Sequence, residues 1–193
     1  MGSRRTTAFG LRARRGVFID RDGVLTNALE RDGKPFPPTT LAAVSFASGA
    51  REAVARLRDA GLVTICVTNQ PDVARGTLAR DVADEINRLV VDRLGLDDLI
   101  ACFHDDADSC TCRKPKPGML VAGATRWELS LKTSYMIGDR WRDIDAGAAA
   151  GCKTILVDHG WAERASDHRA DARVSSVREA ATWITTDAKE NAT

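Results

Sequence analysis

Short apolar runs typical of buried strands alternate with helical periodicities along most of this 193-residue chain. Strand–helix–strand units repeated along one chain build a parallel sheet with helices on both faces, because each connecting helix must pack back onto the sheet. The expected strands are residues 17–20, 62–68, 99–103, 134–137 and 154–157. The expected helices are residues 51–60, 78–94, 118–127, 141–150 and 176–185. The pattern therefore predicts an α/β fold with a doubly wound parallel sheet.

The first expected strand ends in two carboxylates, Asp20 and Asp22, with Gly23 directly after them. Open α/β sheets bind their ligands at the carboxyl ends of the strands, which is where these residues lie in the predicted fold. Each carboxylate raises the pKa of the other unless a cation or strong donors stabilise both charges. A hard divalent cation such as Mg²⁺ meets that need. The pattern indicates a magnesium-dependent phosphatase in which Asp20 attacks phosphorus.

Three further polar segments each come after an expected strand. They are Thr68-Asn69-Gln70, Arg113-Lys114-Pro115 and Gly138-Asp139-Arg140, the last with Asp143 beyond it. Together they supply a hydroxyl and an amide for phosphate oxygens, two cations, and further acids for a metal, which fits phosphoryl transfer. Any one of them alone is more often a solvated turn or a helix cap. Because loops of this kind converge on one edge of a doubly wound sheet, the whole set predicts a single phosphate site.

Three of the five cysteines crowd together with a histidine after the third expected strand. The four side chains are Cys102, His104, Cys110 and Cys112. Thiolate and imidazole ligands suit tetrahedral Zn²⁺, and four of them leave no position for water, so such a site is structural. The alternative is a reduced surface loop that is merely rich in cysteine. The acidic residues inside the loop, Asp105, Asp106 and Asp108, are expected to form a solvated turn. Because the loop leads into Arg113 and Lys114, zinc would hold both cations on a rigid support.

Charge and length limit the kind of protein that this chain forms. A net charge of +1 gives no overall field for nucleic acid or an anionic membrane, and no apolar run is long enough to span a bilayer. We expect one domain over residues 16–188, monomeric and cytoplasmic, because the length suits one core and the cysteines suit a reducing compartment. The arginine-rich residues 1–15 should form a disordered extension, with a transit peptide as the alternative. The proline-containing segment 27–48 should be an irregular flap near the end of the first strand.

Four motifs give the chain a resemblance to the haloacid dehalogenase (HAD) superfamily of phosphatases over about residues 17–157. They are Asp20-Arg21-Asp22-Gly23-Val24, Thr68-Asn69-Gln70 with Ala74-Arg75-Gly76, Cys112-Arg113-Lys114-Pro115-Lys116-Pro117-Gly118-Met119, and Gly138-Asp139-Arg140-Trp141-Arg142-Asp143. With the cysteine loop, they resemble more closely the branch that holds D-glycero-D-manno-heptose 1,7-bisphosphate phosphatase and the phosphatase domain for histidinol phosphate.

The resemblance implies a role for each residue of the expected reaction. Asp20 would be the nucleophile and would form an aspartyl-phosphate. Asp22 would protonate the leaving oxygen and then activate the water that hydrolyses the intermediate. Thr68 would bind the transferring phosphoryl group, and Lys114 would neutralise its charge.

The resemblance also implies which residues hold substrate and metal. The substrate-binding residues would be Asn69, Gln70, Arg113 and Arg140. The ligands of Mg²⁺ would be Asp20, the backbone carbonyl of Asp22, and Asp139, with Asp143 orienting them. The substrate would be a small phosphorylated sugar, first of all the heptose bisphosphate, losing its 7-phosphate.

The chain departs from the family pattern beside the expected substrate site. Pro71-Asp72 stands where a small residue and a glycine usually follow Thr68-Asn69-Gln70, the zinc loop is short, and residues 34–38 are rich in proline. No insert is long enough for a large cap domain, so the site should be open. These departures leave the substrate undecided, with histidinol phosphate or another small phosphomonoester as the alternative. A zinc-stabilised module that binds sugar phosphates without catalysis is a further alternative, although every expected catalytic side chain is present.

Overall fold

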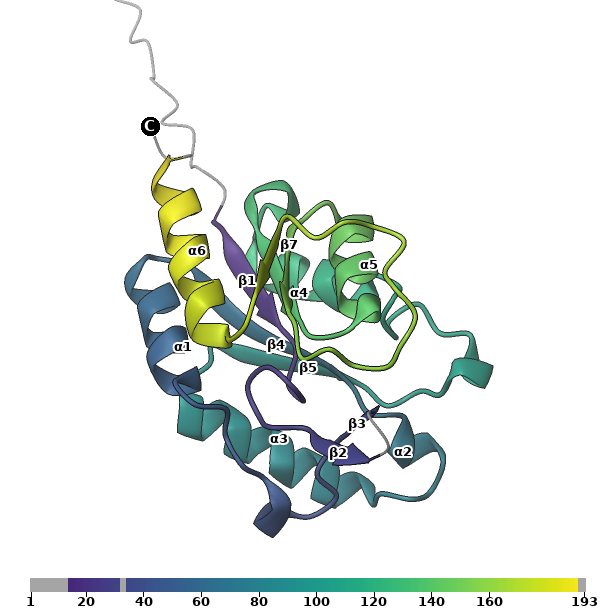
Figure 1. Ribbon diagram of the computed structural model, residues 1–193. Coiled ribbons are helices and arrows are strands. Elements are labelled where there is room, and N and C mark those ends of the chain that lie inside the picture. The colour runs from purple at the N-terminus through teal and green to yellow at the C-terminus, as the bar shows by residue number, and fades with distance from the viewer. Residues whose placement is uncertain (1–13, 32–33, 191–193) are drawn as a thin grey trace, which may run out of the picture.

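A six-stranded parallel sheet forms the centre of the molecule (Figure 1). The computed structural model describes residues 14–31 and 34–190 of the chain. The strands of this sheet are β1 (Gly16–Ile19), β4 (Val63–Asn69), β5 (Asp98–Cys102), β6 (Tyr135–Gly138), β7 (Lys153–Val157) and β8 (Ala172–Val174). Their order is β5-β4-β1-β6-β7-β8, and each neighbouring pair is parallel. Because the order changes direction at β1, the loops after β1, β4 and β6 meet at one edge, where sheets of this kind bind ligands.

Helices cover both faces of this sheet, as predicted for a doubly wound fold (Figure 1). One face carries α1 (Ala50–Asp59), α3 (Arg80–Leu94) and α6 (Val177–Glu190), and the other carries α4 (Gly118–Trp127) and α5 (Trp141–Ala150). Side chains alternate across a strand, so β1 serves both layers. Val17 and Ile19 pack with the first set of helices, and Phe18 packs with the second. Because β1 is buried on both faces, its position is fixed, and so is that of Asp20, the residue directly after it.

The five strands expected from the sequence are all present, each within one residue of its predicted bounds. The sixth strand, β8, was not expected, because its three residues are partly exposed and form no apolar run. The remaining short elements are α2 (Pro71–Ala74) and the 3₁₀ turns η1 (Leu41–Ala43), η2 (Asp106–Asp108) and η3 (Leu131–Thr133). Periodicity could not reveal elements that are shorter than two helical turns.

The segment 27–48 contains more regular structure than the irregular flap that we expected. Strands β2 (Leu29–Arg31) and β3 (Lys34–Phe36) pair antiparallel in a separate two-stranded sheet. Pro35 lies opposite Glu30 in this pair, and a proline is tolerated there because both strands are edge strands. The hairpin brings Pro35, Phe36 and Pro37 to the wall of the cavity described below. The segment therefore lies at the sheet edge where the flap was expected.

Residues 1–13 of the expected N-terminal extension lie outside the described part of the chain. Arg14 and Arg15, its last two residues, both contact the domain. The carbonyl of Arg14 accepts a hydrogen bond from the Ser130 N–H at 2.9 Å, and Arg15 Nη1 donates to the Ala188 carbonyl at 3.1 Å. Among the described residues, no helix is both long enough and apolar enough to cross a membrane.

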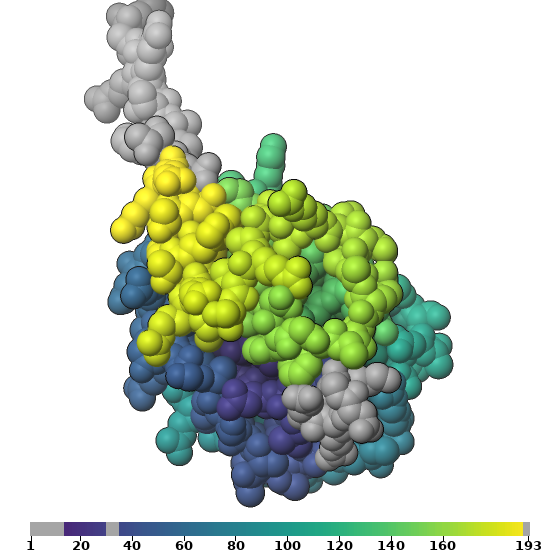
Figure 2. Space-filling view, viewed as in Figure 1, coloured from purple at the N-terminus to yellow at the C-terminus, as the bar shows by residue number. Residues whose placement is uncertain are grey.

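Two loops that are distant in sequence lie side by side on the surface at the carboxyl edge of the sheet. Figure 2 shows the yellow-green segment after β7 beside the purple segment after β1. His159 in the first loop and Gly23 in the second are joined by a hydrogen bond of 2.7 Å. The loop after β7 therefore borders the region in which Asp20 and Asp22 lie.

Candidate active site

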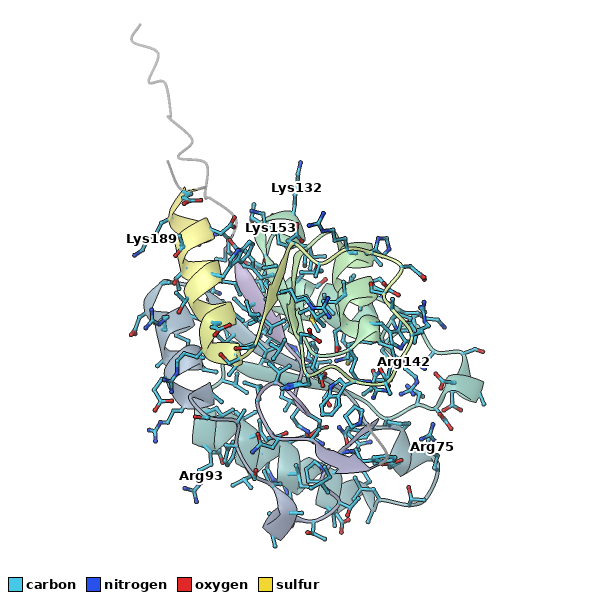
Figure 3. The ribbon with its side chains drawn as sticks, in the orientation of Figure 1. Arg75, Arg93, Lys132, Arg142, Lys153 and Lys189 are labelled. Carbon is cyan, nitrogen blue, oxygen red and sulfur yellow. The ribbon has the colours of Figure 1, made fainter. Side chains whose placement is uncertain are left out.

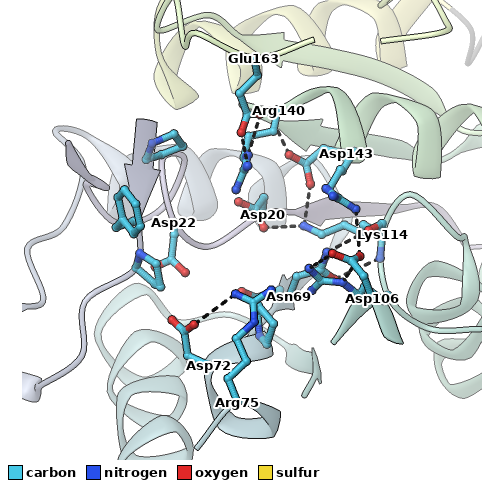
Figure 4. Close-up of a pocket in the computed structure, with 17 residues that line it drawn as sticks. Asp20, Asp22, Asn69, Asp72, Arg75, Asp106, Lys114, Arg140, Asp143 and Glu163 are labelled. Atoms are coloured by element: carbon cyan, nitrogen blue, oxygen red, sulfur yellow. Dashed lines mark hydrogen bonds and ion pairs between the residues drawn. The ribbon is translucent and has the colours of Figure 1, made fainter. Parts of the chain in front are cut away.

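A cavity of about 310 Å³ lies at the carboxyl edge of the sheet, over the ends of β1, β4 and β6 (Figure 4). Most of the residues expected to act on substrate line it. They are Asp20, Asp22, Thr68, Asn69, Arg113, Lys114 and Arg140. Asp139 and Gln70 are buried and do not line the cavity. The strand-end loops therefore converge as the sequence predicted.

Lys114 and two carboxylates form a buried network in this cavity. Lys114 Nζ lies 2.5 Å from Asp20 Oδ1 and 2.6 Å from Asp143 Oδ1, and it donates to the Val67 carbonyl at 2.8 Å. These contacts use all three N–H donors of the ammonium group. Burial alone would lower the pKa of Lys114, but Asp143 and Asp20 raise it above its ordinary value. The lysine is therefore a fixed positive charge that faces the expected nucleophile.

Asp20, Asp139 and Asp143 lie close enough together to share one cation, because an oxygen of each is within 4.8 Å of the others. Burial raises the pKa of Asp20 to about 7 against the opposing effect of Lys114, and Asp143 and Asp22 add to the rise. Burial, Asp20 and Asp143 also raise the pKa of Asp139 well above its usual range. Asp139 Oδ1 is buried and has no hydrogen-bond partner among the described residues. One ammonium does not balance three carboxylates, so this cluster suits a hard divalent cation.

Asp22 has its own partners, apart from the three-carboxylate cluster. Arg21 donates to it from Nε at 3.0 Å and from Nη2 at 2.9 Å. Thr26 Oγ1 donates at 3.0 Å and Gln70 Nε2 at 2.9 Å. Arg21 is fully buried, which the sequence did not suggest for a charged residue between two aspartates. These donors fix the position of the Asp22 carboxyl at the cavity wall.

Thr68 and Asn69 are the last two residues of β4 and Gln70 follows it, and the three side chains differ in what they contact. Gln70 is fully buried, and its Nε2 donates to Thr68 Oγ1 at 2.9 Å as well as to Asp22. It therefore holds those two residues in place, where we had expected a contact with substrate. Asn69 Nδ2 donates to the Lys114 carbonyl at 3.0 Å, and Asn69 Oδ1 accepts from the Lys114 N–H at 3.1 Å. Asn69 thus ties the end of β4 to the lysine.

The predicted cysteine–histidine cluster is assembled beside the cavity. The ligand atoms of Cys102, His104, Cys110 and Cys112 lie within 4.8 Å of one another. Cys112 Sγ is 3.2 Å from Cys102 Sγ, 3.5 Å from Cys110 Sγ and 3.3 Å from His104 Nδ1. Burial alone would raise the pKa of Cys110, but the Arg113 N–H, 3.4 Å from its sulfur, and the neighbouring cysteines lower it to about 7. A set of three thiols and one imidazole at these distances suits a tetrahedral metal ion.

The acidic residues of this loop form the turn that we expected, with Asp106 and Asp108 exposed, but two of them also pair with arginines. Asp105 pairs with Arg75, which follows α2, at 2.6 Å. Asp106 pairs with Arg113 at 2.8 Å and with Arg142 of α5 at 3.4 Å. Figure 3 shows that Arg75 and Arg142 both approach this loop from other elements. The loop therefore orients three arginines at the cavity, and the sequence missed this because the pairing depends on where α2 and α5 lie.

Arg113 and Arg140 both line the cavity, but they differ in what they offer a ligand. Arg113 is only 9% exposed, and its Nη1 is buried without a hydrogen-bond partner in the described part of the chain. Arg140 is already paired with Glu163, to which its Nε donates at 2.9 Å and its Nη2 makes a second contact. A ligand must therefore share Arg140 with Glu163. The sequence offered no signal for Glu163, which lies in a loop without a motif.

Comparisons with known proteins agree with this geometry. Residues 111–180 match the family described as HAD-hydrolase-like. The chain is 34% identical over 149 residues to the D-glycero-β-D-manno-heptose-1,7-bisphosphate 7-phosphatase of Bordetella bronchiseptica, a match that covers 75% of this chain and 80% of that protein. The protein of the same name from Pseudomonas putida is 32% identical over 153 residues, covering 77% of this chain and 85% of that one.

The fold agrees with a solved structure from the same group. The crystal structure of D,D-heptose 1,7-bisphosphate phosphatase from B. bronchiseptica, complexed with magnesium and phosphate, superposes with a TM-score of 0.73 and 26% identity over 90% of this chain and 99% of that chain. The sequence match, the parallel sheet and the converging strand-end residues all lead to one assignment. The chain belongs to the HAD superfamily of phosphatases, in the family of the D-glycero-D-manno-heptose 1,7-bisphosphate phosphatases.

Proposed function

We propose that this protein hydrolyses the 7-phosphate of D-glycero-D-manno-heptose 1,7-bisphosphate in a Mg²⁺-dependent reaction through an aspartyl-phosphate. The proposal rests on one observation: three carboxylates and one ammonium group lie close together at one edge of the sheet. They belong to Asp20, Asp139, Asp143 and Lys114, and Asp22 lines the adjoining cavity. The class of reaction, hydrolysis of a phosphoric monoester, is that of the family. The relatives named above carry the heptose bisphosphate in their names, which supports this substrate.

In the first half of the reaction, a carboxylate oxygen of Asp20 attacks phosphorus and the bond from phosphorus to the sugar oxygen breaks. Asp22 gives a proton to that leaving oxygen. Lys114 Nζ, 2.5 Å from Asp20 Oδ1, holds the attacking carboxylate and compensates charge on the transferring group. Thr68 Oγ1 accepts a hydrogen bond from Gln70, so its own proton remains available for a phosphoryl oxygen.

In the second half, a water molecule attacks phosphorus, Asp22 accepts its proton, and the bond from phosphorus to Asp20 breaks to release phosphate. The hydrogen bonds from Arg21, Thr26 and Gln70 hold the Asp22 carboxyl in place beside the cavity. We expect this carboxyl to turn from Arg21 toward the leaving oxygen when substrate fills the cavity.

Asp20 and Asp139, with the backbone carbonyl of Asp22, would hold the magnesium ion. The unpartnered Asp139 Oδ1 and the excess of carboxylate charge over Lys114 support this assignment. When Mg²⁺ is bound, the chemistry that it supplies is neutralisation of charge on the phosphoryl oxygens. Asp143, which lies 2.6 Å from Lys114 Nζ, acts as an orienting residue.

A substrate with a second phosphate suits the arginines of the cavity wall. Arg75, Arg113 and Arg142 are all held by carboxylates of the cysteine–histidine loop. Guanidinium groups recognise phosphate through paired N–H donors, and Arg113 Nη1 has no hydrogen-bond partner within the described part of the chain. These three cations favour a bisphosphate over a monophosphate.

A panel of phosphomonoesters assayed with Mg²⁺ tests the proposed substrate. We expect kcat/KM for the heptose 1,7-bisphosphate to exceed those for heptose 7-phosphate and histidinol phosphate by about 10²-fold or more, because the wall arginines lose their partner in the monophosphates. A preference for histidinol phosphate would contradict the assigned substrate. Tight binding of sugar phosphates without turnover of any ester would instead support a non-catalytic module.

We infer that Zn²⁺ occupies the cluster of Cys102, His104, Cys110 and Cys112 and that its role is structural. Three thiols and one imidazole match the ligand preference of zinc and leave no position open for water. The last ligand, Cys112, directly precedes Arg113 and Lys114 in the chain. The metal would therefore hold both cations in position for substrate.

Loss of this metal should impair catalysis through Lys114. We expect a Cys110→Ser variant to lose zinc, to melt a few degrees lower and to lose about 10²-fold in kcat/KM, since a displacement of about 1 Å costs that much. Zinc content, melting temperature and kinetics with excess Mg²⁺ measure these effects. Cys152→Ala, which alters a buried cysteine outside the cluster, is the control and should keep its zinc. A zinc-free variant with unchanged turnover and melting temperature would rule out the role.

A further inference from the structure

The loop after β7 makes hydrogen bonds to both loops that carry the expected magnesium ligands. His159 Nε2 donates to the Gly23 carbonyl at 2.7 Å, and Trp161 Nε1 donates to Asp139 Oδ2 at 2.7 Å. The two rings lie against each other, with centroids 5.1 Å apart. This loop carries no group that the proposed reaction uses. Its contacts are nevertheless with residues at the metal site.

The surroundings of Asp139 leave one oxygen fixed and the other free. Trp161 holds Oδ2, and Gly23 packs so closely that a Cβ built on it would lie 2.0 Å from the same oxygen. Gly23 also has a φ of +100°, a conformation that other residues rarely adopt, so a side chain is excluded there. Oδ1 is buried and has no partner among the described residues. Oδ1 is therefore the better placed oxygen for a cation, because Trp161 and Gly23 already surround Oδ2.

The group that donates a hydrogen bond to Asp139, the indole N–H of Trp161, carries no charge, which matters for binding a cation. A lysine or arginine in the place of Trp161 would also orient the carboxylate, but its charge would compete with the metal for Asp139. An indole N–H fixes the carboxylate while leaving its negative charge for the metal.

From these contacts we propose that Trp161 is a positioning residue that sets the affinity for the catalytic magnesium ion. Its N–H holds Asp139 Oδ2 so that Oδ1 faces the cation, and His159 supports the neighbouring Gly23 loop. This inference rests on the proposed magnesium site. It adds a residue that contacts neither substrate nor metal and acts only through Asp139.

Calorimetric titration of Mg²⁺ without substrate tests the role directly. Trp161→Phe keeps an aromatic ring but removes the donor, and we expect the Mg²⁺ dissociation constant to rise about 10- to 100-fold, as for other residues that orient metal ligands. The melting temperature in chelator should change little. Trp161→Gln restores an N–H donor and should recover part of the affinity. Trp183→Phe, which alters a ring packed on Tyr135, is the matched control and should bind Mg²⁺ as the wild type does.

Tryptophan fluorescence gives a second readout that a purely structural role would not alter. Mg²⁺ should change the emission of the wild type and of Trp183→Phe, and Trp161→Phe should lose this response. Equal Mg²⁺ affinity in the wild type and Trp161→Phe would overturn the positioning role alone. Failure of the wild type to bind Mg²⁺ would overturn the metal site, and the role of Trp161 with it.

Discussion

An Asp20→Asn variant is expected to lose turnover by a factor of about 10⁴ or more, because an amide cannot attack phosphorus to form the covalent intermediate. The substitution preserves side-chain shape, and its amide oxygen can still accept the hydrogen bond from Lys114 Nζ. The fold should therefore be retained. Mass spectrometry of acid-quenched wild-type reactions should find phosphate on the peptide that contains Asp20.

The same substitution should stabilise the metal-free protein at neutral and higher pH. Burial raises the pKa of Asp20 to about 7, so the folded protein holds this proton more tightly than the unfolded chain does. Wild-type stability therefore falls as pH rises from about 4, the pKa of an unfolded aspartate, toward 7. Asn does not titrate, so the advantage of the variant in melting temperature should grow across this interval.

The control for both measurements is Asp59→Asn, a change in an exposed residue at the end of α1. It should alter neither turnover nor the pH dependence of melting. Substantial turnover in Asp20→Asn would remove Asp20 as the nucleophile. A variant less stable than the wild type at pH 8 in chelator would show that the carboxylate cluster is not under electrostatic strain.

The residues that the sequence located correctly are those whose place follows from topology alone. Asp20 and Asp139 come directly after strands that apolar runs reveal, and Thr68 is the next-to-last residue of another such strand. Parallel strands of a doubly wound sheet end at one edge. Because β4, β1 and β6 are neighbours in the sheet, the three residues lie close together for any conformation of the loops. The cysteine–histidine cluster could be predicted for a different reason, since its members are close in sequence and share one chemistry.

The partners of these residues could not be predicted, because they depend on how loops and helices pack. Arg21 is buried against Asn87 of α3, with Nη1 donating to Oδ1 at 2.6 Å, and no local pattern relates two residues so far apart. Asp106 meets Arg142 only because α5 begins beside the cysteine–histidine loop. Trp161 reaches Asp139 from a loop without periodicity. Sequence patterns therefore identified the groups that react, and the structure was needed for the groups that orient them.

Removal of the Lys114 ammonium should have the second-largest effect, on stability as well as on catalysis. Lys114 is 2% exposed, and its Nζ is the cation that contacts both Asp20 and Asp143. A Lys114→Met variant keeps the unbranched chain but leaves two buried carboxylates uncompensated, which costs about 3–5 kcal/mol. For a domain of this size, that corresponds to a melting temperature lower by about 10 °C. Turnover should fall on the order of 10³-fold with the loss of charge stabilisation.

The pH dependence separates this effect from simple loss of packing. Lys114 opposes the rise in the pKa of Asp20, so in the variant that pKa should move above 7. Protonation of Asp20 then relieves the penalty at low pH, and the stability deficit should be small near pH 5 and large at pH 8. Thermal melts in chelator across this range, with the exposed Lys132→Met as control, measure it. A deficit that does not vary with pH would mean that Lys114 contributes through its methylene groups and that the buried charge network has no energetic role.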